Sequence, residues 1–188
     1  STAAIAAARA GARTLLIERY GFLGGTSTGV LDTFYGFYTP GTRSLKVVGG
    51  IGDDVVAELR KIGACFERRN TYGAGTGVTY NSEHLKVVWE RLAEQSGARI
   101  LLHAWMQEAT VFGGKVRSIT VATKQGLRTL EADYFVDATG DADLCHFAGA
   151  PCELAGQHEP AQMLTTTFKV ANVDTAARNA ISKKEFHE

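Results

Sequence analysis

An acidic residue, Glu18, follows a short apolar run at residues 14–17, and this position is the first in the chain where binding chemistry is expected. The run lacks polar alternation, which is typical of a parallel strand buried on both faces. A carboxylate at the carboxyl end of such a strand can accept hydrogen bonds from both hydroxyls of a ribose. Glu18 is therefore a candidate ligand for the sugar of a dinucleotide. Arg19 beside it is a candidate to lie over the adenine base of that dinucleotide, although exposed arginines at strand ends are common.

Two later segments could bring the backbone close to a phosphate group. The first is the loop Gly24, Gly25, Thr26 and Ser27, whose glycines permit close approach and whose hydroxyls can bind anions, unless it is an ordinary glycine loop. The second is the turn at residues 139–141, which follows an apolar segment at 134–138. A tight turn at the carboxyl edge of a parallel sheet brings backbone beside a cofactor.

The elements that must position these residues alternate between helix and strand. The alanine-rich residues 1–10 predict a helix that Gly11 ends, followed by the strand at 14–17. Apolar spacing predicts further helices at 53–62 and from Ser82, as the N-cap, to about 95. A second buried strand is expected at 98–103. Glycines at positions 73, 75 and 77 are followed by an extended run at 78–80, which argues against a phosphate-binding turn because that turn needs a helix directly after it.

The segment from residue 107 to about 132 has a different pattern. Its polar and apolar residues alternate, and Gly113-Gly114 and Lys124-Gln125-Gly126 divide it into three short strands, which predicts an antiparallel meander. A strand is expected next at 134–138 and a short helix at 144–148. Beyond a polar loop, the sequence predicts a strand at 163–170 and a helix at 173–181.

Two stretches, ARAGARTLLIERYGFLGGTSTG and FVDATGDADLCHFAGAP, resemble the FAD-dependent oxidoreductases of the glutathione-reductase-like flavoproteins, in the subgroup related to fumarate reductase flavoproteins. The resemblance implies FAD as the cofactor and a Gly-x-Gly-x-x-Gly turn before Ser1. It implies that Gly24 to Ser27, Thr139 and Gly140 approach the diphosphate. It also implies that Asp141 holds the second turn and that main-chain groups of Met106 hold adenine.

The expected fold is α/β, a Rossmann-like parallel FAD-binding sheet lacking its first strand, with a three-stranded antiparallel meander. Residues 1–152 are expected to form part of an FAD-binding domain, and residues 153–188 the start of a substrate domain or a linker. The expected function is hydride or electron transfer between the flavin and an unidentified small substrate. The segment as given is expected to bind FAD poorly and to be inactive, and no catalytic residue is assigned.

Two other functions fit the same residues. One is an NAD-binding Rossmann dehydrogenase, in which Glu18 would bind a ribose in the same way, and the other is a non-catalytic, degenerate nucleotide-binding module. Twenty basic and twenty acidic side chains give a net charge of zero, which argues against nucleic acid or membrane partners. The three cysteines have no C-x-x-C spacing, which favours a reducing, cytoplasmic location. Cys145 fits an inert buried thiol better than a redox group. The histidines have no metal-ligand spacing, so no metal is expected.

Overall fold

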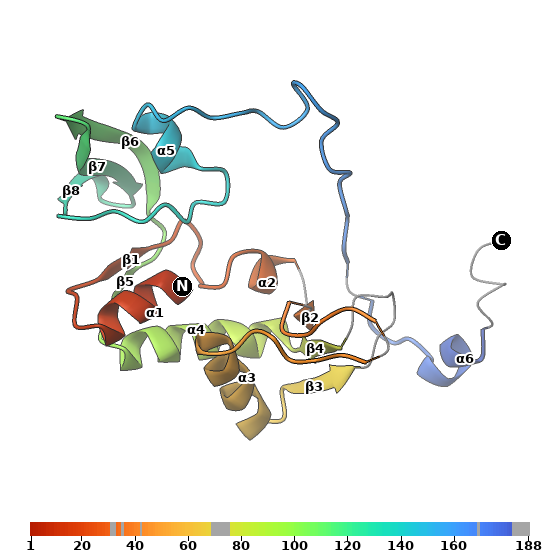
Figure 1. Ribbon diagram of the computed structural model, residues 1–188. Coiled ribbons are helices and arrows are strands. Elements are labelled where there is room, and N and C mark those ends of the chain that lie inside the picture. The colour runs from red at the N-terminus through yellow and green to blue at the C-terminus, as the bar shows by residue number, and fades with distance from the viewer. Residues whose placement is uncertain (31–32, 35, 42, 69–75, 169, 182–188) are drawn as a thin grey trace.

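The computed structural model describes residues 1–30, 33–34, 36–41, 43–68, 76–168 and 170–181 (Figure 1). A long helix, α4 (Ser82–Gln95), lies between two antiparallel three-stranded sheets, one toward each of its ends. A two-stranded parallel sheet combines one strand that precedes this helix in the chain with one that follows it and leads into one of the antiparallel sheets. The observed architecture is therefore mixed α/β, as predicted.

The helical layer buries the larger of two apolar clusters. Three helices contribute, α1 (Thr2–Arg9), α3 (Ile51–Lys61) and α4, and the short helices are α2 (Thr26–Gly29), α5 (Asp143–Phe147) and α6 (Thr175–Ala180). Ile5, Leu59 and Leu85 are fully buried in this cluster, one from each of the three main helices. Their burial follows the apolar stripe of each helix, since side chains three to four positions apart share a helix face.

The N-cap of α4 is a correction to the sequence prediction. Asn81, one residue before the predicted Ser82, accepts hydrogen bonds from the N–H groups of Glu83 at 2.9 Å and His84 at 3.2 Å. Ser82 is the first helical residue and is buried. Both residue types cap helices well, so composition alone does not decide between neighbours.

The parallel sheet pairs β1 (Leu15–Ile17) with β5 (Arg99–Leu101), as the two buried-type runs predicted. Pairing continues one residue beyond β1, because the N–H of Glu18 donates to the carbonyl of Leu101 at 2.9 Å. Leu15 is exposed while Leu16 and Ile17 are half-buried, so this strand is not buried on both faces along its length.

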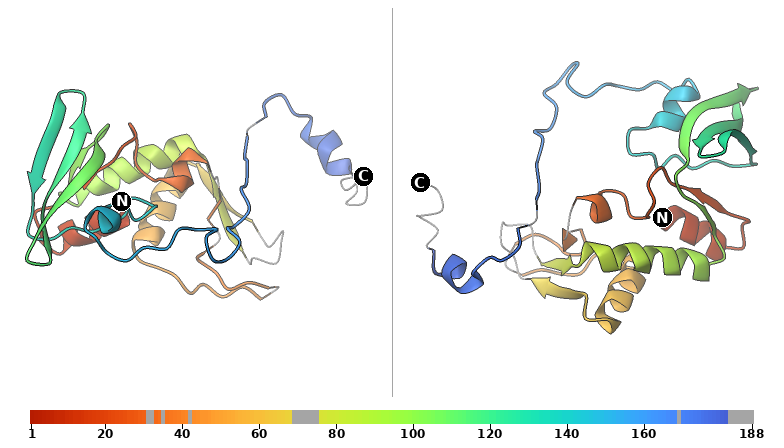
Figure 2. Two further views of the ribbon diagram at one scale, coloured as in Figure 1. Left: turned by 90° about the horizontal axis from the view of Figure 1, so that it is seen from above. Right: turned by 180° about the vertical axis from the view of Figure 1, so that it is seen from behind.

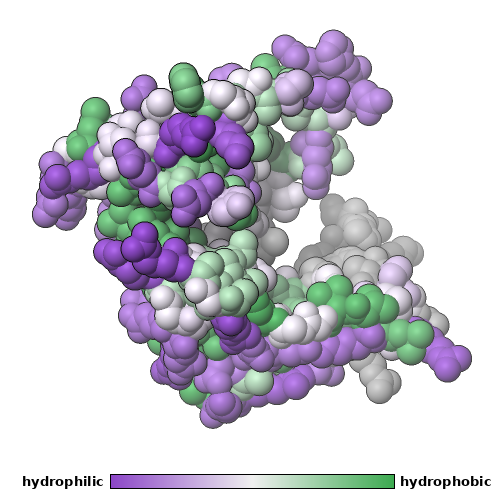
Figure 3. All heavy atoms as spheres, turned by 60° about the vertical axis from the view of Figure 1, so that its left-hand side comes forward, coloured by the Kyte–Doolittle hydropathy of each residue, from purple (hydrophilic) through white to green (hydrophobic). Residues whose placement is uncertain are grey.

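The predicted meander is confirmed. It consists of β6 (Trp105–Phe112), β7 (Lys115–Thr123) and β8 (Gly126–Glu131), in the order β6-β7-β8. Its inner face forms the second apolar cluster, where the buried Ile119 and Val121 meet Ile17 of β1. The outer surface carries exposed Phe112 and Leu127, and Figure 3, which turns this end of the molecule forward, shows hydrophobic patches among hydrophilic side chains.

The remaining sheet has the order β2-β4-β3, with β2 (Thr33–Phe34), β3 (Cys65–Arg68) and β4 (Gly77–Tyr80). The extended run at 78–80 was predicted, whereas β2 and β3 were not, because runs of two and four residues give no clear alternation. Of the glycine-rich run, positions 70–75 lie outside the described residues. Phe34 packs against Phe37 and Tyr80, with ring centroids 5.6 and 4.3 Å away, and Phe34 and Tyr80 belong to the apolar cluster of the helical layer.

Two predicted strands are wrong. Residues 134–138 run without regular structure toward α5, and Tyr134 is 91% exposed. The described part of residues 163–170 is likewise extended but unpaired, with Leu164 fully exposed; its Thr167 hydroxyl donates to the carbonyl of Val30 at 3.2 Å. A strand needs a hydrogen-bonded neighbour as well as alternating residues, and sequence pattern reports only the second. The predicted helix near 173–181 is confirmed as α6, capped by Asp174. Residues 182–188 lie outside the described residues.

Candidate functional site

Glu18 lies directly after β1 and is half-buried. One carboxylate oxygen accepts a hydrogen bond from the N–H of Tyr20 at 2.9 Å. The main-chain carbonyl of Glu18 accepts from Ala104 at 3.0 Å, which fixes the residue against the start of the meander. The carboxylate is thus held in place with acceptor capacity remaining, since each oxygen can accept two hydrogen bonds.

Arg19 extends along the surface beside Glu18. Its guanidinium carbon lies 4.8 Å from the ring centroid of Tyr20 and 6.0 Å from that of Trp105. Met106, the other predicted base-binding position, follows Trp105 in β6, and its side chain packs into the cluster beneath the meander. The structure therefore brings Glu18, Arg19 and the main chain of Met106 into one neighbourhood.

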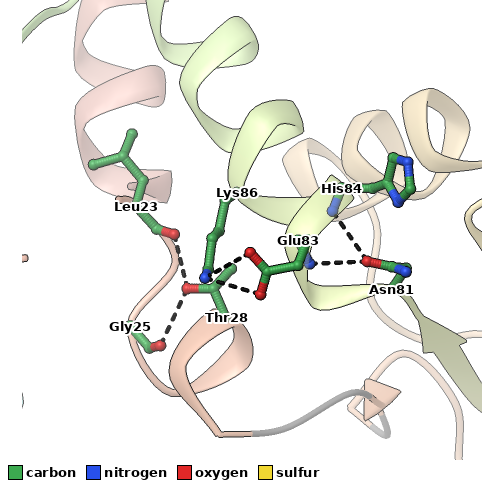
Figure 4. Close-up of polar contacts among 7 residues, drawn as sticks. All are labelled: Leu23, Gly25, Thr28, Asn81, Glu83, His84 and Lys86. Atoms are coloured by element: carbon green, nitrogen blue, oxygen red, sulfur yellow. Dashed lines mark hydrogen bonds and ion pairs between the residues drawn. The ribbon is translucent and has the colours of Figure 1, made fainter. Parts of the chain in front are cut away.

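The predicted loop Gly24 to Ser27 is partly helical, because Thr26 begins the short helix α2 with Gly25 as its N-cap. The Ser27 hydroxyl donates to the carbonyl of Gly24 at 2.7 Å. The buried Thr28 hydroxyl lies 2.8 Å from the carbonyl of Leu23 and 3.3 Å from that of Gly25 (Figure 4). These hydroxyls direct their protons to the loop's own carbonyls. A ligand at this loop would therefore meet backbone groups and the exposed Thr26, rather than the Ser27 hydroxyl as a donor.

Gly24 is required for the geometry of this loop. Its φ is +116°, and a Cβ at this position would lie 2.4 Å from Cγ2 of Thr28. A contact of that length is impossible without displacing the neighbour, and an L side chain rarely adopts that φ. Gly24 was predicted to allow close approach to a ligand, and the close approach that the structure shows is to Thr28 of α2.

The second turn is organised by Asp137, which sequence reasoning missed. One of its oxygens accepts from the N–H of Thr139 at 3.0 Å and from the Thr139 hydroxyl at 2.8 Å. The other oxygen accepts from the N–H of Cys145 in α5 at 2.9 Å. The Thr139 hydroxyl accepts in turn from the N–H of Asp143 at 2.9 Å. An aspartate two residues before a turn is a known side-chain mimic of a backbone turn, and this signal was present in the sequence.

Asp141, which was predicted to hold this turn, is exposed, and the bonds that hold the turn come from Asp137. Gly140 has a φ of +96° and Ala142 a φ of +59°, so two residues adopt left-handed conformations. Such conformations concentrate at functional sites when the surroundings enforce them. Within the described residues, the N–H groups of Gly140, Asp141 and Ala142 meet no protein acceptor. These donors are available to an anion.

The electrostatics of the turn depend on the same carboxylate. Burial alone raises the pKa of Asp137, but the hydrogen bonds from Thr139 and Cys145 outweigh it, and the pKa lies below its usual value. The Asp137 carboxylate, with a smaller contribution from burial, raises the pKa of the Cys145 thiol. A thiol with a raised pKa is a poor nucleophile, so Cys145 fits the inert alternative.

The two segments meet through the second apolar cluster. Ile17, immediately before Glu18, packs against the same cluster as Phe135 and Leu144, which flank the turn at 137–143. Figures 1 and 2 show the chain between β8 and α5 passing beside the loop that follows β1 and over the start of α1. Glu18 and the turn at 139–141 therefore lie in the same part of the molecule.

The donor set fits a flavin adenine dinucleotide. A half-buried carboxylate suits ribose hydroxyls, and the N–H groups at 140–142 suit a diphosphate, because backbone N–H groups in left-handed turns form anion-binding concavities. The parallel strand, the carboxylate after it and the turn beside it define a dinucleotide-binding α/β protein. Within the described residues, no cluster of histidine, cysteine or acidic side chains could hold a metal ion.

Residues 1–188 match the family described as FAD dependent oxidoreductase, and the chain belongs to this family. FAD is the cofactor of the family, as the resemblance predicted. No curated protein matches the chain. The placement in the fumarate-reductase-related subgroup stays a prediction.

Among solved structures, the Diels-Alderase PyrE3 of pyrroindomycin biosynthesis is 18% identical with a TM-score of 0.50, over 79% of this chain and 32% of that one. THI4 of Thermovibrio ammonificans is 16% identical with a TM-score of 0.48, over 77% and 55%. Glycerol-3-phosphate dehydrogenase of Bacillus halodurans, solved with FAD, is 16% identical with a TM-score of 0.43, over 69% and 29%. The chain thus spans about half or less of each, and the likeness to PyrE3 concerns the fold.

None of the helices in the described part of the chain is both long and apolar enough to cross a membrane. The location of the protein in the cell stays a prediction.

Proposed function

We propose that this chain is the cofactor-binding part of an oxidoreductase in which bound FAD exchanges hydride or electrons with a small-molecule substrate. The observation that carries the proposal is the position of Glu18, held after a parallel strand in the same neighbourhood as the turn at 139–141. Membership of the FAD dependent oxidoreductase family supports the same conclusion. The net charge of zero agrees with a small substrate rather than a nucleic acid.

The binding roles follow the chemistry of each group. Glu18 accepts hydrogen bonds from the ribose of the adenosine half, and Arg19 and the main chain of Met106 lie beside the adenine. Backbone groups from Gly24 to Ser27 and from Thr139 to Asp141 bind the diphosphate. Asp137 holds the second of these segments in shape through Thr139 and Cys145. When bound, the flavin supplies the redox chemistry, and the protein orients it and shields it from water.

The domain division belongs to the same proposal. Residues 1–152 form part of the FAD-binding domain, and residues 153–188 begin the substrate domain or form a linker. The extended course of the chain after α5 supports a boundary there, because residues 150–168 have no regular structure and are exposed. Such segments with few contacts are typical of domain boundaries.

The test is to identify the ligand and its redox activity in the full-length protein. Mass spectrometry of the released ligand is expected to give FAD, and the flavin absorption is expected to bleach on anaerobic reduction and recover with an electron acceptor. Release of NAD would replace the proposal with the dehydrogenase alternative. Protein that contains no nucleotide and binds no added FAD would instead be a degenerate module.

A further inference from the structure

The two tryptophans of the described chain occupy opposite environments. Trp89 on α4 is 8% exposed, packs in the core of the helical layer, and its indole N–H has no partner within the described residues. Trp105 at the start of β6 is 57% exposed. Trp105 is therefore accessible to a ligand, whereas Trp89 is enclosed by the core.

Trp105 belongs to a row of cationic and aromatic side chains beside Glu18. The Arg19 guanidinium lies 6.0 Å from the Trp105 ring and 4.8 Å from the Tyr20 ring, and Tyr20 stacks on Phe22 with an interplanar angle of 8°. Lys86 lies 4.1 Å from the other ring of that stack, that of Phe22, and pairs with Glu83 at 3.0 Å (Figure 4). The Lys86–Glu83 ion pair thus lies at one end of this row, and Trp105 at the other end is exposed to solvent.

The backbone holds this open end close to Glu18. The Glu18 carbonyl accepts from Ala104, the residue before Trp105, at 3.0 Å, and the Tyr20 carbonyl accepts from His103 at 3.2 Å. The loop after β1 and the start of β6 are therefore joined directly, with Trp105 next in the chain. Because adenine is bonded directly to the ribose, a base whose ribose is held by Glu18 lies within reach of the neighbouring rings.

We propose that Trp105 provides a stacking surface for the adenine ring of FAD, with the Arg19 guanidinium completing the same surface. This inference rests on the proposed function, because it requires FAD with its ribose at Glu18. An aromatic ring and a guanidinium plane both stack on a purine, so both side chains can contact the same bound base. Trp105 thereby fixes the orientation of the base, while Met106 contributes main-chain groups from the next position.

Fluorescence tests the contact without relying on enzyme activity. The emission of Trp105 is isolated in full-length protein by subtraction. The tryptophan emission of the double variant Trp89→Phe/Trp105→Phe is subtracted from that of the single variant Trp89→Phe. ADP, which has the adenosine and diphosphate but no flavin, is expected to quench this emission and to be displaced by FAD. Emission that stays unchanged at ADP concentrations that displace FAD would overturn the inference.

Affinity provides the second measurement. Trp105→Leu is expected to weaken FAD binding about tenfold, whereas Trp105→Phe retains most of the affinity because a ring is kept. Phe112→Leu is the matched control, since Phe112 is 74% exposed at the far end of the same strand. If the wild-type protein binds FAD and Trp105→Leu binds it equally well, the stacking role is wrong and the proposed function stands. If the wild-type protein binds no FAD, both fail.

Discussion

The two segments that flank the expected diphosphate are fixed by different forces. In the loop before α2, the Ser27 and Thr28 hydroxyls donate to carbonyls of the same loop, and Gly24 lets it pack tightly on Thr28. In the turn before α5, one ionised side chain, Asp137, gathers donors from Thr139 and Cys145. The first segment depends on neutral hydrogen bonds and packing, and the second on a charge. They should therefore respond differently to steric changes, to removal of one side chain and to pH.

The largest effect is expected from Gly24→Ala. The added Cβ would lie 2.4 Å from Thr28 Cγ2 at a φ of +116°, so the loop must shift, at a cost of about 3 kcal/mol in the free energy of unfolding. Urea unfolding monitored by circular dichroism measures it. Gly29→Ala is the control in α2, because no atom lies within 4 Å of its added Cβ. Equal stability of the two variants would show that the loop is not fixed by packing at Gly24.

Removal of the charged side chain in the second segment is expected to be the next largest effect. Asp137→Ala leaves the N–H groups of Thr139 and Cys145 without their acceptor and should destabilise the protein by about 2 kcal/mol, the usual range for bonds to a charged group. Asp137→Asn keeps one acceptor oxygen and should lose less. Asp133→Ala, an exposed acid in the same segment, is the control. A loss no greater than that of the control would assign the turn's geometry to something other than this carboxylate.

A smaller effect is expected in the first segment, the loop before α2. The Tyr80 hydroxyl donates to the carbonyl of Ser27 at 2.7 Å and ties α2 to β4. Tyr80→Phe keeps the ring in the core and removes this neutral bond, which should cost about 1 kcal/mol of unfolding free energy. Thermal unfolding against wild type measures the change. An unchanged unfolding temperature would mean that this bond does not hold the first loop.

The smallest effect is the pH dependence that only the second segment should show. The hydrogen bonds to Asp137 lower its pKa in the folded state, so its contribution is complete above the pKa of an unfolded aspartate, about 4. The contribution is lost as the pH falls through the lower folded value. The stability difference between wild type and Asp137→Asn should therefore shrink below about pH 4, whereas that between wild type and Tyr80→Phe should stay constant. If the difference for Tyr80→Phe changed with pH and that for Asp137→Asn stayed constant, the charge would act in the first segment and not in the second.

Much of the fold could be predicted because it depends on local pattern. The spacing of Val55, Val56 and Leu59 predicts α3, and the glycine-containing turns at 113–114 and 124–126 predict the divisions of the meander. The strand predicted at 134–138 is not formed, because an apolar run does not report whether a neighbouring strand is within hydrogen-bonding distance. Strands β2 and β3 were missed because their stability comes from pairing with β4 rather than from their own residues.

The site residues also divide into those that the sequence pattern predicts and those that only the structure shows. Glu18 was identified because its position depends on the end of one strand, which sequence reports well. The role of holding the turn was assigned to Asp141 because the family resemblance implied it, and only geometry shows that the carboxylate of Asp137 faces the N–H groups. Trp105 gave no sequence signal, since its exposure follows from the register of β6 against β7.

The most direct test of the account is the affinity of the full-length protein for FAD with Glu18 altered. Calorimetric titration is expected to show that Glu18→Gln, which keeps the size of the side chain but not its charge, weakens FAD binding about tenfold, because hydrogen bonds to a charged acceptor contribute about 1.5–3 kcal/mol. Glu94→Gln on the exposed surface of α4 is expected to bind FAD as wild type does. If Glu18→Gln binds FAD as tightly as Glu94→Gln, the carboxylate does not hold the ribose and the account is wrong.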